Sequence, residues 1–297
     1  MKYCGIGGQA VLEGIMMRNR NRYAVAVRKS DGTIETTVEE LHPFSEKHRW
    51  AAFPFIRGFV SLIESLKTGM KTLMWSASFE EDENGDPVEM KKSDEVWTVV
   101  LAVVMALAIF VVLPTVLVNL LKRWIGSSVL MALIEGILRL CMFIGYIAAV
   151  SRVPDIKRTF MYHGSEHKCI NCIESGKELT VENVMASSKE HRRCGTSFIL
   201  IVVLISIVVF MIIRVDNIFL RIAVRILMIP VIAGLSYEIL RYTGNSNSRF
   251  AYLISRPGMW MQGLTTKEPT EDMVEVAITA VEKVFDWRAF QKESFSN

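Results

Sequence analysis

The sequence has few charged residues and almost no excess of either sign. Charged residues make up 22% of its 297 residues, and the 34 Lys and Arg against 31 Asp and Glu give a formal net charge of +3. Proteins that bind nucleic acid usually carry a basic excess, or a basic stripe with interleaved aromatic side chains. The sequence has neither, and we therefore exclude nucleic acid as a partner.

Cysteine is also scarce, and its distribution does not indicate disulfides. The five cysteines are an odd number spread unevenly along the chain, whereas secreted disulfide scaffolds are short and rich in cysteine. These features favour free thiols. The first thirty residues contain Glu13 and several glycines but no continuous apolar stretch, so we expect no cleavable signal peptide.

Hydrophobic residues, in contrast, are abundant. They make up 51% of the chain, and the mean hydropathy of +0.30 is too apolar for a typical soluble protein or a disordered one. About 20 apolar residues are needed to cross the hydrocarbon core as a helix. Four segments have this character, with Pro114 accommodated as a kink in the first: residues 96–121, 127–150, 197–213 and 218–240.

The predicted spans form two tight hairpins, because only residues 122–126 and 214–217 separate the members of each pair. The three longer segments therefore share one side of the membrane. Residues 1–95, 151–196 and 241–297 contain 28 of the 34 Lys and Arg. By the positive-inside rule we expect both termini and the central loop in the cytoplasm, at the plasma (inner) membrane. In that reducing compartment, clustered Cys and His indicate metal binding or catalysis before disulfides.

The fold class predicted is a membrane α-helical protein with a cytoplasmic α+β portion. Residues 23–38 indicate a β-hairpin, and residues 53–75 an amphipathic helix, packed on the sheet or at the membrane interface, with packing favoured. Residues 268–285 indicate an amphipathic surface helix. The soluble parts are an N-terminal region, an acidic linker, a His/Cys loop between the two helical hairpins, and a C-terminal region: residues 1–78, 79–95, 151–196 and 241–297.

The strongest constellation of reactive side chains lies in the central loop. His163, Glu166 and His167 form the order H-x-x-E-H, and His191 and Cys194 follow. Histidines four residues apart on a helix face the same way and can both bind Zn²⁺, and in inverted-motif zinc proteases the intervening Glu is the general base. The sequence predicts a divalent metal, best matched by zinc, bound by His163, His167 and either His191 or Cys194, with Glu166 as the catalytic residue.

Other interpretations compete with this one. Gly164 weakens the helix that would align the two imidazoles, and ordinary surface histidines beside reduced, partly buried cysteines are the alternative. Cys169 and Cys172 form a C-x-x-C pair, typical of a zinc knuckle or a redox pair, but the strand-to-helix context of a thioredoxin motif is missing, so we rank them below the histidines. Cys4 and Cys141 lack polar neighbours and are expected to be structural.

The glycine-rich start, residues 4–18, invites comparison with phosphate-binding loops but lacks their G-K-[ST] ending. A close approach of another chain segment explains these glycines equally well. Within this stretch, Glu13 could reach a metal or Arg18, or remain solvated.

Charged residues also fall inside the predicted spans: Glu135 and Arg139 in the second, Arg221 and Arg225 in the fourth. A charge that faces lipid costs several kcal/mol, so we expect these side chains to face protein or water, with Glu135 paired to Arg221 or Arg225. The two interpretations are a functional polar pathway and snorkelling of the arginines to the interface. Glu135 is too central in its span to snorkel easily.

Five motifs together identify a relationship: residues 7–18, 162–168, 193–198, 234–239, and 257–262 with 264–269. Over nearly the whole chain they resemble the YqhQ-like bacterial membrane proteins, an uncharacterised family labelled as predicted metal-dependent enzymes. The resemblance implies a family pattern that includes all five candidate site residues of the central loop but neither Cys169 nor Cys172. Arg192 stands where the family often has proline, which loosens the turn before Cys194.

Our leading hypothesis is a metal-dependent hydrolase of unknown substrate, with zinc activating a water that Glu166 deprotonates. The alternative is a non-enzymatic membrane scaffold or membrane-protein biogenesis factor associated with the export machinery, in which a structural metal staples the loop. Transport is a third hypothesis and needs the intramembrane charges to line a pathway. The partners implied are the lipid bilayer, a membrane protein and, with the oligomeric state left open, a second copy of the chain.

Overall fold

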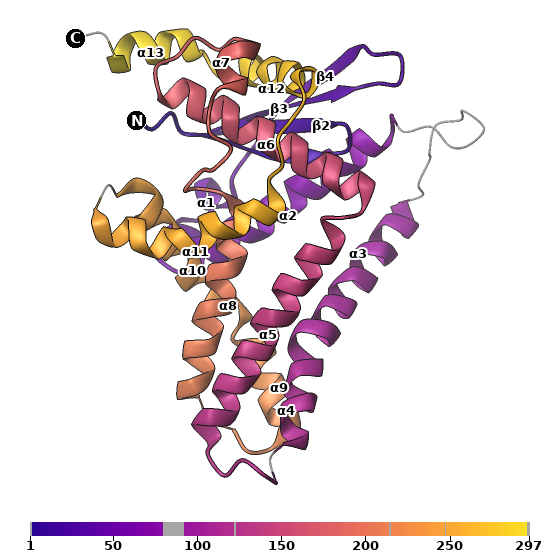
Figure 1. Cartoon of the computed structure of the whole chain (residues 1–297), viewed down its shortest axis with the longest axis vertical. Helices are drawn as coiled ribbons and strands as arrows, with labels where there is room; N and C mark the ends of the chain where they lie inside the picture. Colours follow the sequence, from indigo (N-terminus) through magenta and orange to yellow (C-terminus); the bar gives the residue numbers. More distant parts are fainter. Residues whose placement is uncertain (1, 80–91, 122, 214, 247, 296–297) are drawn as a thin grey trace.

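The computed structural model describes residues 2–79, 92–121, 123–213, 215–246 and 248–295. It has a head, in which a β-sheet lies between helices, and a bundle of long helices that extends from the head (Figure 1). Both ends of the chain lie in the head. Most of the predicted acidic linker, residues 80–91, lies outside the described residues.

The sheet is an antiparallel meander in the order β1-β2-β3-β4, formed by Ile6–Val11, Gly14–Asn19, Arg22–Arg28 and Ile34–Glu40. β3 and β4 confirm the predicted hairpin over residues 23–38. The glycine-rich start gave no sign of the first hairpin, β1–β2. Its turn contains Glu13, at a φ of 45°. The Glu13 carboxylate accepts a hydrogen bond from Arg158 Nε at 2.6 Å, so the structure pairs it with Arg158 and not with Arg18.

Both faces of the sheet are apolar, because alternate side chains of the central strands point in opposite directions. One face packs against α6 (Pro154–Glu174) and α12 (Glu271–Val284) through Ile15, Met17, Ala24 and Ala26. The other face packs against α2 (Ile56–Ala77) through Val11, Met16, Tyr23, Val25 and Val27. α2 thus packs on the sheet, which is the option that the sequence favoured.

The bundle contains α3 (Lys92–Leu107), the π-helix η2 (Ala108–Val112), α4 (Leu113–Leu120), α5 (Ser128–Val150), α8 (Gly195–Ile212), α9 (Ile218–Leu227) and α10 (Ile229–Asn245). By length and composition, three helical stretches can cross a membrane: Val96–Leu120, Val129–Val150 and Gly195–Ile212. The expected fourth span, 218–240, is not one straight helix. α9 and α10 meet at a bend of 43°, so there are four spans only if this pair is a broken one.

Two prolines account for the irregular helices of the bundle. Pro230 lies in the first turn of α10, where a missing N–H is tolerated but the preceding helix cannot continue regularly. Pro114 is the second residue of α4, which follows the π-helical turn η2. A π-turn shifts the backbone hydrogen bonds by one residue and so accommodates the N–H that Pro114 lacks.

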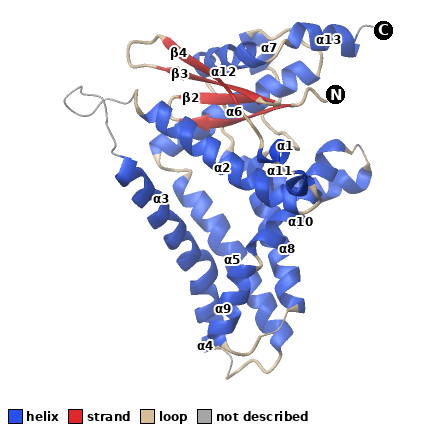
Figure 2. Ribbon diagram, turned by 180° about the vertical axis from the view of Figure 1, so that it is seen from behind, coloured by secondary structure: helices blue, strands red, loops and turns tan. Residues whose placement is uncertain are grey.

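The remaining helices are α1 (Phe44–Lys47), the 3₁₀-helix η1 (Arg49–Ala52), α7 (Val181–Met185), α11 (Arg249–Thr265) and α13 (Trp287–Phe295). α2, α10 and α11 lie between the sheet and the other helices of the bundle (Figure 2). α2 crosses α10 where Gly58 meets Gly234, and Arg57 Nε donates to Glu238 at 2.6 Å beside this crossing. These helices therefore join the head to the bundle.

A buried ionic cluster links α5 to α9 inside the bundle. Glu135 Oε1 lies 3.2 Å from Arg139, accepts from the Thr115 hydroxyl at 2.9 Å, and is in direct contact with Arg225. Arg221 instead donates to a backbone carbonyl of the α8–α9 turn. Of the two cross-bundle partners that the sequence offered for Glu135, the structure pairs it with Arg225.

Glu135→Ala should lower the free energy of unfolding by about 3 kcal/mol, since it leaves two buried guanidinium groups without their anion. Adding Arg225→Leu should restore part of this loss. Adding Arg221→Leu should not, because Arg221 does not contact Glu135. Denaturant unfolding of the full chain in detergent micelles measures both double mutants, and simple additivity in the Arg225 case would mean that the pair carries no coupling energy.

Candidate metal centre

Three of the predicted ligands come together at the junction of head and bundle. His163 and His167 lie one turn apart on α6, and Cys194 is the N-cap residue of α8. One ligand atom from each of the three side chains lies within 4.8 Å of the other two. The head and the first turn of a bundle helix thus contribute to the same cluster.

α6 remains helical through Gly164, although glycine weakens helices. The connection between α11 and α12 crosses α6 here, and a Cβ atom on Gly164 would lie 2.0 Å from the carbonyl oxygen of Lys267. Only glycine permits this approach. Gly164, which on helix propensity alone argues against a regular helix here, is therefore the residue that allows the α11–α12 connection to pack beside the two histidines.

Each histidine is oriented by a backbone carbonyl. Nδ1 of His163 lies 2.9 Å from the carbonyl oxygen of Thr265, and Nδ1 of His167 lies 2.6 Å from that of Lys189. Because a carbonyl only accepts, Nδ1 must carry the proton in both rings, which directs the two Nε2 atoms to the cluster. Metal-binding histidines are typically held in this way. His163 Nε2 lies 3.1 Å from Cys194 Sγ.

The loop that supplies Cys194 is held by buried polar side chains that the sequence did not reveal as site residues. Gln262 accepts from the His191 N–H at 2.9 Å and donates to the His191 carbonyl at 2.7 Å. Lys168 and Asn171, both on α6, donate to four carbonyls between residues 185 and 190. Gln262 lies in one of the five motifs, but its role depends on a contact between segments far apart in the sequence.

The thiol of Cys194 and the imidazole of His163 stabilise each other in their charged forms. Burial disfavours protonation of His163, but the Cys194 thiolate, Glu166 and the Thr265 carbonyl together outweigh burial and raise the pKa of His163 to about 9. Burial likewise disfavours the thiolate, but His163 and His167 lower the pKa of Cys194 well below its ordinary value. Cys194 is therefore held as a thiolate, the form that binds metals.

His191 lies beside the cluster rather than in it. Its Nε2 is 3.8 Å from the carboxylate of Glu174 and 3.1 Å from the guanidinium of Arg193. Glu174 also accepts from the backbone N–H of Cys4 at 3.0 Å, and so ties the start of the chain to α6. Of the two candidates for a third ligand, Cys194 is the one that converges with the histidines.

Glu166 is buried and bound to the sheet. Its Oε1 accepts a hydrogen bond from the backbone N–H of Gly8 at 2.7 Å. A Cβ atom on Gly8 would lie 3.1 Å from the Glu166 carboxyl carbon and 2.5 Å from the Met16 carbonyl, so glycine permits a close approach here. β1 thereby fixes the orientation of Glu166 on α6.

The other cysteines lie apart from the three-residue cluster. Cys4, Cys169 and Cys172 are buried free thiols in the head, and Cys141 is exposed on α5. Burial raises the pKa of Cys169, with a further contribution from the charge of Cys172. A neutral, buried thiol is a poor ligand and a poor nucleophile.

Glu174→Gln should destabilise the head at neutral pH. Although burial disfavours its charge, the neighbouring His191 and the hydrogen bonds from Arg193 and the Cys4 N–H together outweigh burial and lower the pKa of Glu174 to about 2. A lowered pKa stabilises the fold above the unfolded-state value of about 4.3, and this contribution is lost as the pH falls towards 2. The loss at pH 7 should be about 1.5–3 kcal/mol, the usual range for charged hydrogen bonds.

Acid unfolding followed by circular dichroism tests this. The variant should lose much of the pH dependence between 4.5 and 2 that the parent protein shows. Glu178→Gln is the matched control, because Glu178 is exposed four residues along the chain. Equal pH dependence in Glu174→Gln and the parent protein would contradict the assigned role of Glu174.

Comparison with known proteins gives a family but no activity. Residues 53–287 match a family described as a protein of unknown function, DUF1385. The chain is also 35% identical, over 97% of its length and 94% of the relative's, to the uncharacterized protein YqhQ of Bacillus subtilis (strain 168). No solved structure matches the chain. Neither description names a metal, a substrate or a reaction.

Proposed function

Because the chain belongs to the DUF1385 family and carries a His/His/Cys cluster at the base of a bundle with apolar helices, we propose that it is a membrane-spanning metal-dependent hydrolase with its site at the cytoplasmic membrane surface. The observation that carries this proposal is the convergence of His163, His167 and Cys194, with both imidazoles oriented by backbone carbonyls.

Two observations support the membrane placement and its orientation. The helices of the bundle expose many large apolar side chains, such as Leu101, Val104 and Ile212 at 62%, 54% and 74%, which water disfavours and lipid accepts. Both chain ends and the His/Cys loop lie in the head, whereas the two short turns lie at the opposite end of the bundle (Figure 1). This arrangement fits a cytoplasmic head, where the Lys and Arg are concentrated.

Cysteine labelling in intact cells tests the orientation. In a Cys141→Ser background, Arg123→Cys in the first short turn should react with a membrane-impermeant maleimide. Lys177→Cys in the head should react only after the cells are permeabilised. Both positions are exposed, so access and not burial decides the result. The reverse pattern would place the head outside the cytoplasm.

The chemistry of the cluster favours zinc. Two imidazole nitrogens and one thiolate are the borderline and soft ligands that Zn²⁺ prefers, and hard cations such as Mg²⁺ need oxygen ligands. Catalytic zinc sites typically have three ligands from the protein and keep a fourth position for water or substrate. Zinc in such a site supplies Lewis acidity for hydrolysis.

The purified protein should contain about one zinc ion per chain. His163→Ala, His167→Ala and Cys194→Ser should each lose it, whereas His191→Ala should retain it. At neutral pH the metal must displace a proton from His163, whose pKa is about 9. Affinity should therefore fall about tenfold for each pH unit below 9, since one proton competes with the metal. Elemental analysis and competition with a chromogenic chelator measure both effects.

The controls are Cys169→Ser and Cys172→Ser, two thiol substitutions in the same helix that should leave the zinc content unchanged. Loss of zinc in these variants but not in the histidine variants would indicate a cysteine-based knuckle. Zinc at trace level in every chelator-free preparation would contradict metal binding altogether.

We assign Glu166 the role of general base. It follows His163 by one turn on α6, and the Gly8 N–H holds one of its oxygens. In the described part of the chain the second oxygen has no assigned partner and can accept a proton from water. This arrangement orients the carboxylate in the way that catalytic groups require.

A second function is supported by the burial of the cluster. His167 and Cys194 are only 1% and 4% exposed, and the ligands join α6 of the head to the first turn of α8. A metal bound there would cross-link the head to the bundle. This is the scaffold or biogenesis-factor function, in which the metal is structural and the partner is another membrane protein.

Cobalt substitution distinguishes the two functions without a known substrate. In a hydrolase, azide or a hydroxamate should change the visible spectrum of the Co²⁺ protein, because the fourth position is exchangeable. Glu166→Gln should bind Co²⁺ normally but shift the pH dependence of that spectrum. In a scaffold, neither the added anion nor the Glu166→Gln substitution should change the visible spectrum of the Co²⁺ protein. Glu190→Gln, an exposed acid outside the cluster, is the control.

A further inference from the structure

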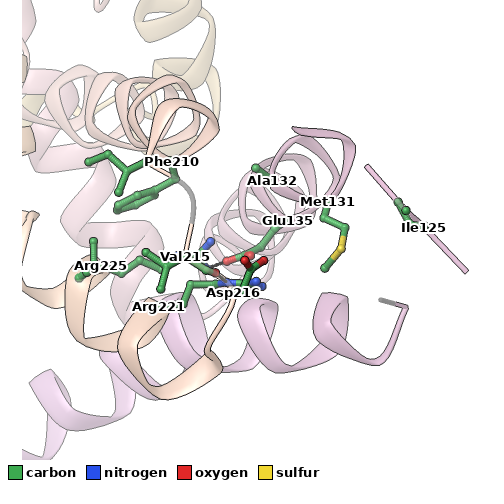
Figure 3. Close-up of a pocket in the computed structure, with 12 residues that line it drawn as sticks. Ile125, Met131, Ala132, Glu135, Phe210, Val215, Asp216, Arg221 and Arg225 are labelled. Carbon is green, nitrogen blue, oxygen red and sulfur yellow. Dashed lines mark hydrogen bonds and ion pairs between the residues drawn. The ribbon is translucent and has the colours of Figure 1, made fainter. Parts of the chain in front are cut away.

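A second polar site lies at the end of the bundle opposite to the head. A cavity of about 280 Å³ opens between α5, α9 and the two short turns (Figure 3). Figure 3 shows charged ends from both α5 and the α8–α9 turn directed into one space, with apolar side chains around them. The charged lining residues are Glu135, Asp216, Arg221 and Arg225, and the apolar ones include Met131 and Phe210.

This site has more positive than negative charge. The buried part contains Arg139 and Arg225, at 7% and 6% exposed, against the single carboxylate of Glu135. At the rim, Asp216 balances Arg221. The charged lining residues are therefore neutral together, and the one unit of positive charge that remains among the described residues is that of Arg139, which contacts Glu135 from outside the lining. An uncompensated charge is costly at this depth in a low-dielectric bundle.

The buried arginines also have unused donors. The Nε atoms of Arg139 and Arg225 are buried and lack a hydrogen-bond partner in the described part of the chain. Such atoms are rare in folded proteins, and of the two arginines Arg225 lines the cavity. The hydrogen bond assigned to Arg221 uses its Nε, which leaves its terminal nitrogens for a ligand.

We propose that this cavity binds the phosphate group of an anionic ligand. Guanidinium groups recognise phosphate oxygens through paired, charge-assisted hydrogen bonds. A single phosphodiester charge would neutralise the excess, whereas a cation would increase it and a neutral ligand would leave it. The volume accommodates a headgroup rather than a whole lipid, and the apolar wall suits a chain attached to it.

Two sources can supply this phosphate. One is a phospholipid headgroup of the membrane leaflet that surrounds this end of the bundle, and the other is a free phosphate compound in solution. The proposal is independent of the metal centre, because the two sites lie at opposite ends of the bundle and share no residue.

Binding to the full chain in detergent tests the proposal with three probes: inorganic phosphate, dihexanoyl phosphatidylglycerol and dihexanoylglycerol, which lacks the phosphate. We expect one of the two phosphate probes to bind and to raise the melting temperature, and dihexanoylglycerol to do neither. Arg221→Gln should weaken that binding at least tenfold. Arg123→Gln, an exposed arginine of the neighbouring turn outside the cavity, should leave it unchanged.

The melting temperature without ligand shows whether Arg221→Gln folds, and Arg221→Lys, which keeps the charge, should bind with intermediate affinity. Binding of inorganic phosphate identifies a free phosphate compound as the source, and binding of the lipid probe alone identifies a headgroup. The proposal fails if neither phosphate probe binds, if dihexanoylglycerol binds equally well, or if Arg123→Gln weakens binding as much as Arg221→Gln.

Discussion

The burial of α6 is the constraint on which both the head and the candidate centre depend. From Tyr162 onwards almost every residue of this helix is buried, among them several polar ones. A helix enclosed on all sides cannot leave polar groups without partners. Glu166 therefore holds the sheet, Lys168 and Asn171 hold the loop after α7, and Glu174 holds the start of the chain. The histidines are fixed because their whole helix is fixed.

Periodicity in the sequence predicts the elements with a clear apolar face. It gave the helix on the sheet and the β3–β4 hairpin, whereas uncharged apolar runs gave the three unbroken helices that are long enough to cross a membrane. It missed β1 and β2. Gly8 on β1 is explained by its close contacts with β2 and with Glu166 on α6, and not by strand propensity. It also missed the break before Pro230, since a hydropathy window does not register a bend within an apolar run.

The candidate site was predictable to the extent that it is local. His163 and His167 are four residues apart, and the helical repeat alone places them together. The choice of Cys194 over His191 as the third ligand was not predictable, because it depends on where Gln262 holds the loop. The effect of Gly164 was predicted with the wrong sign: propensity counts glycine against a helix, but the Lys267 carbonyl lies where any side chain would be.

The order of the chain has a consequence for its synthesis. The sheet is complete at Glu40, whereas α12, which covers one of its faces, begins at Glu271. At about 5–20 residues per second, a ribosome needs on the order of ten seconds or more to make the intervening segment. During that time every apolar helix of the bundle is translated, while the part of the sheet that α12 covers has no partner. The head is therefore the last part of the molecule to mature, although its strands are the first to be translated.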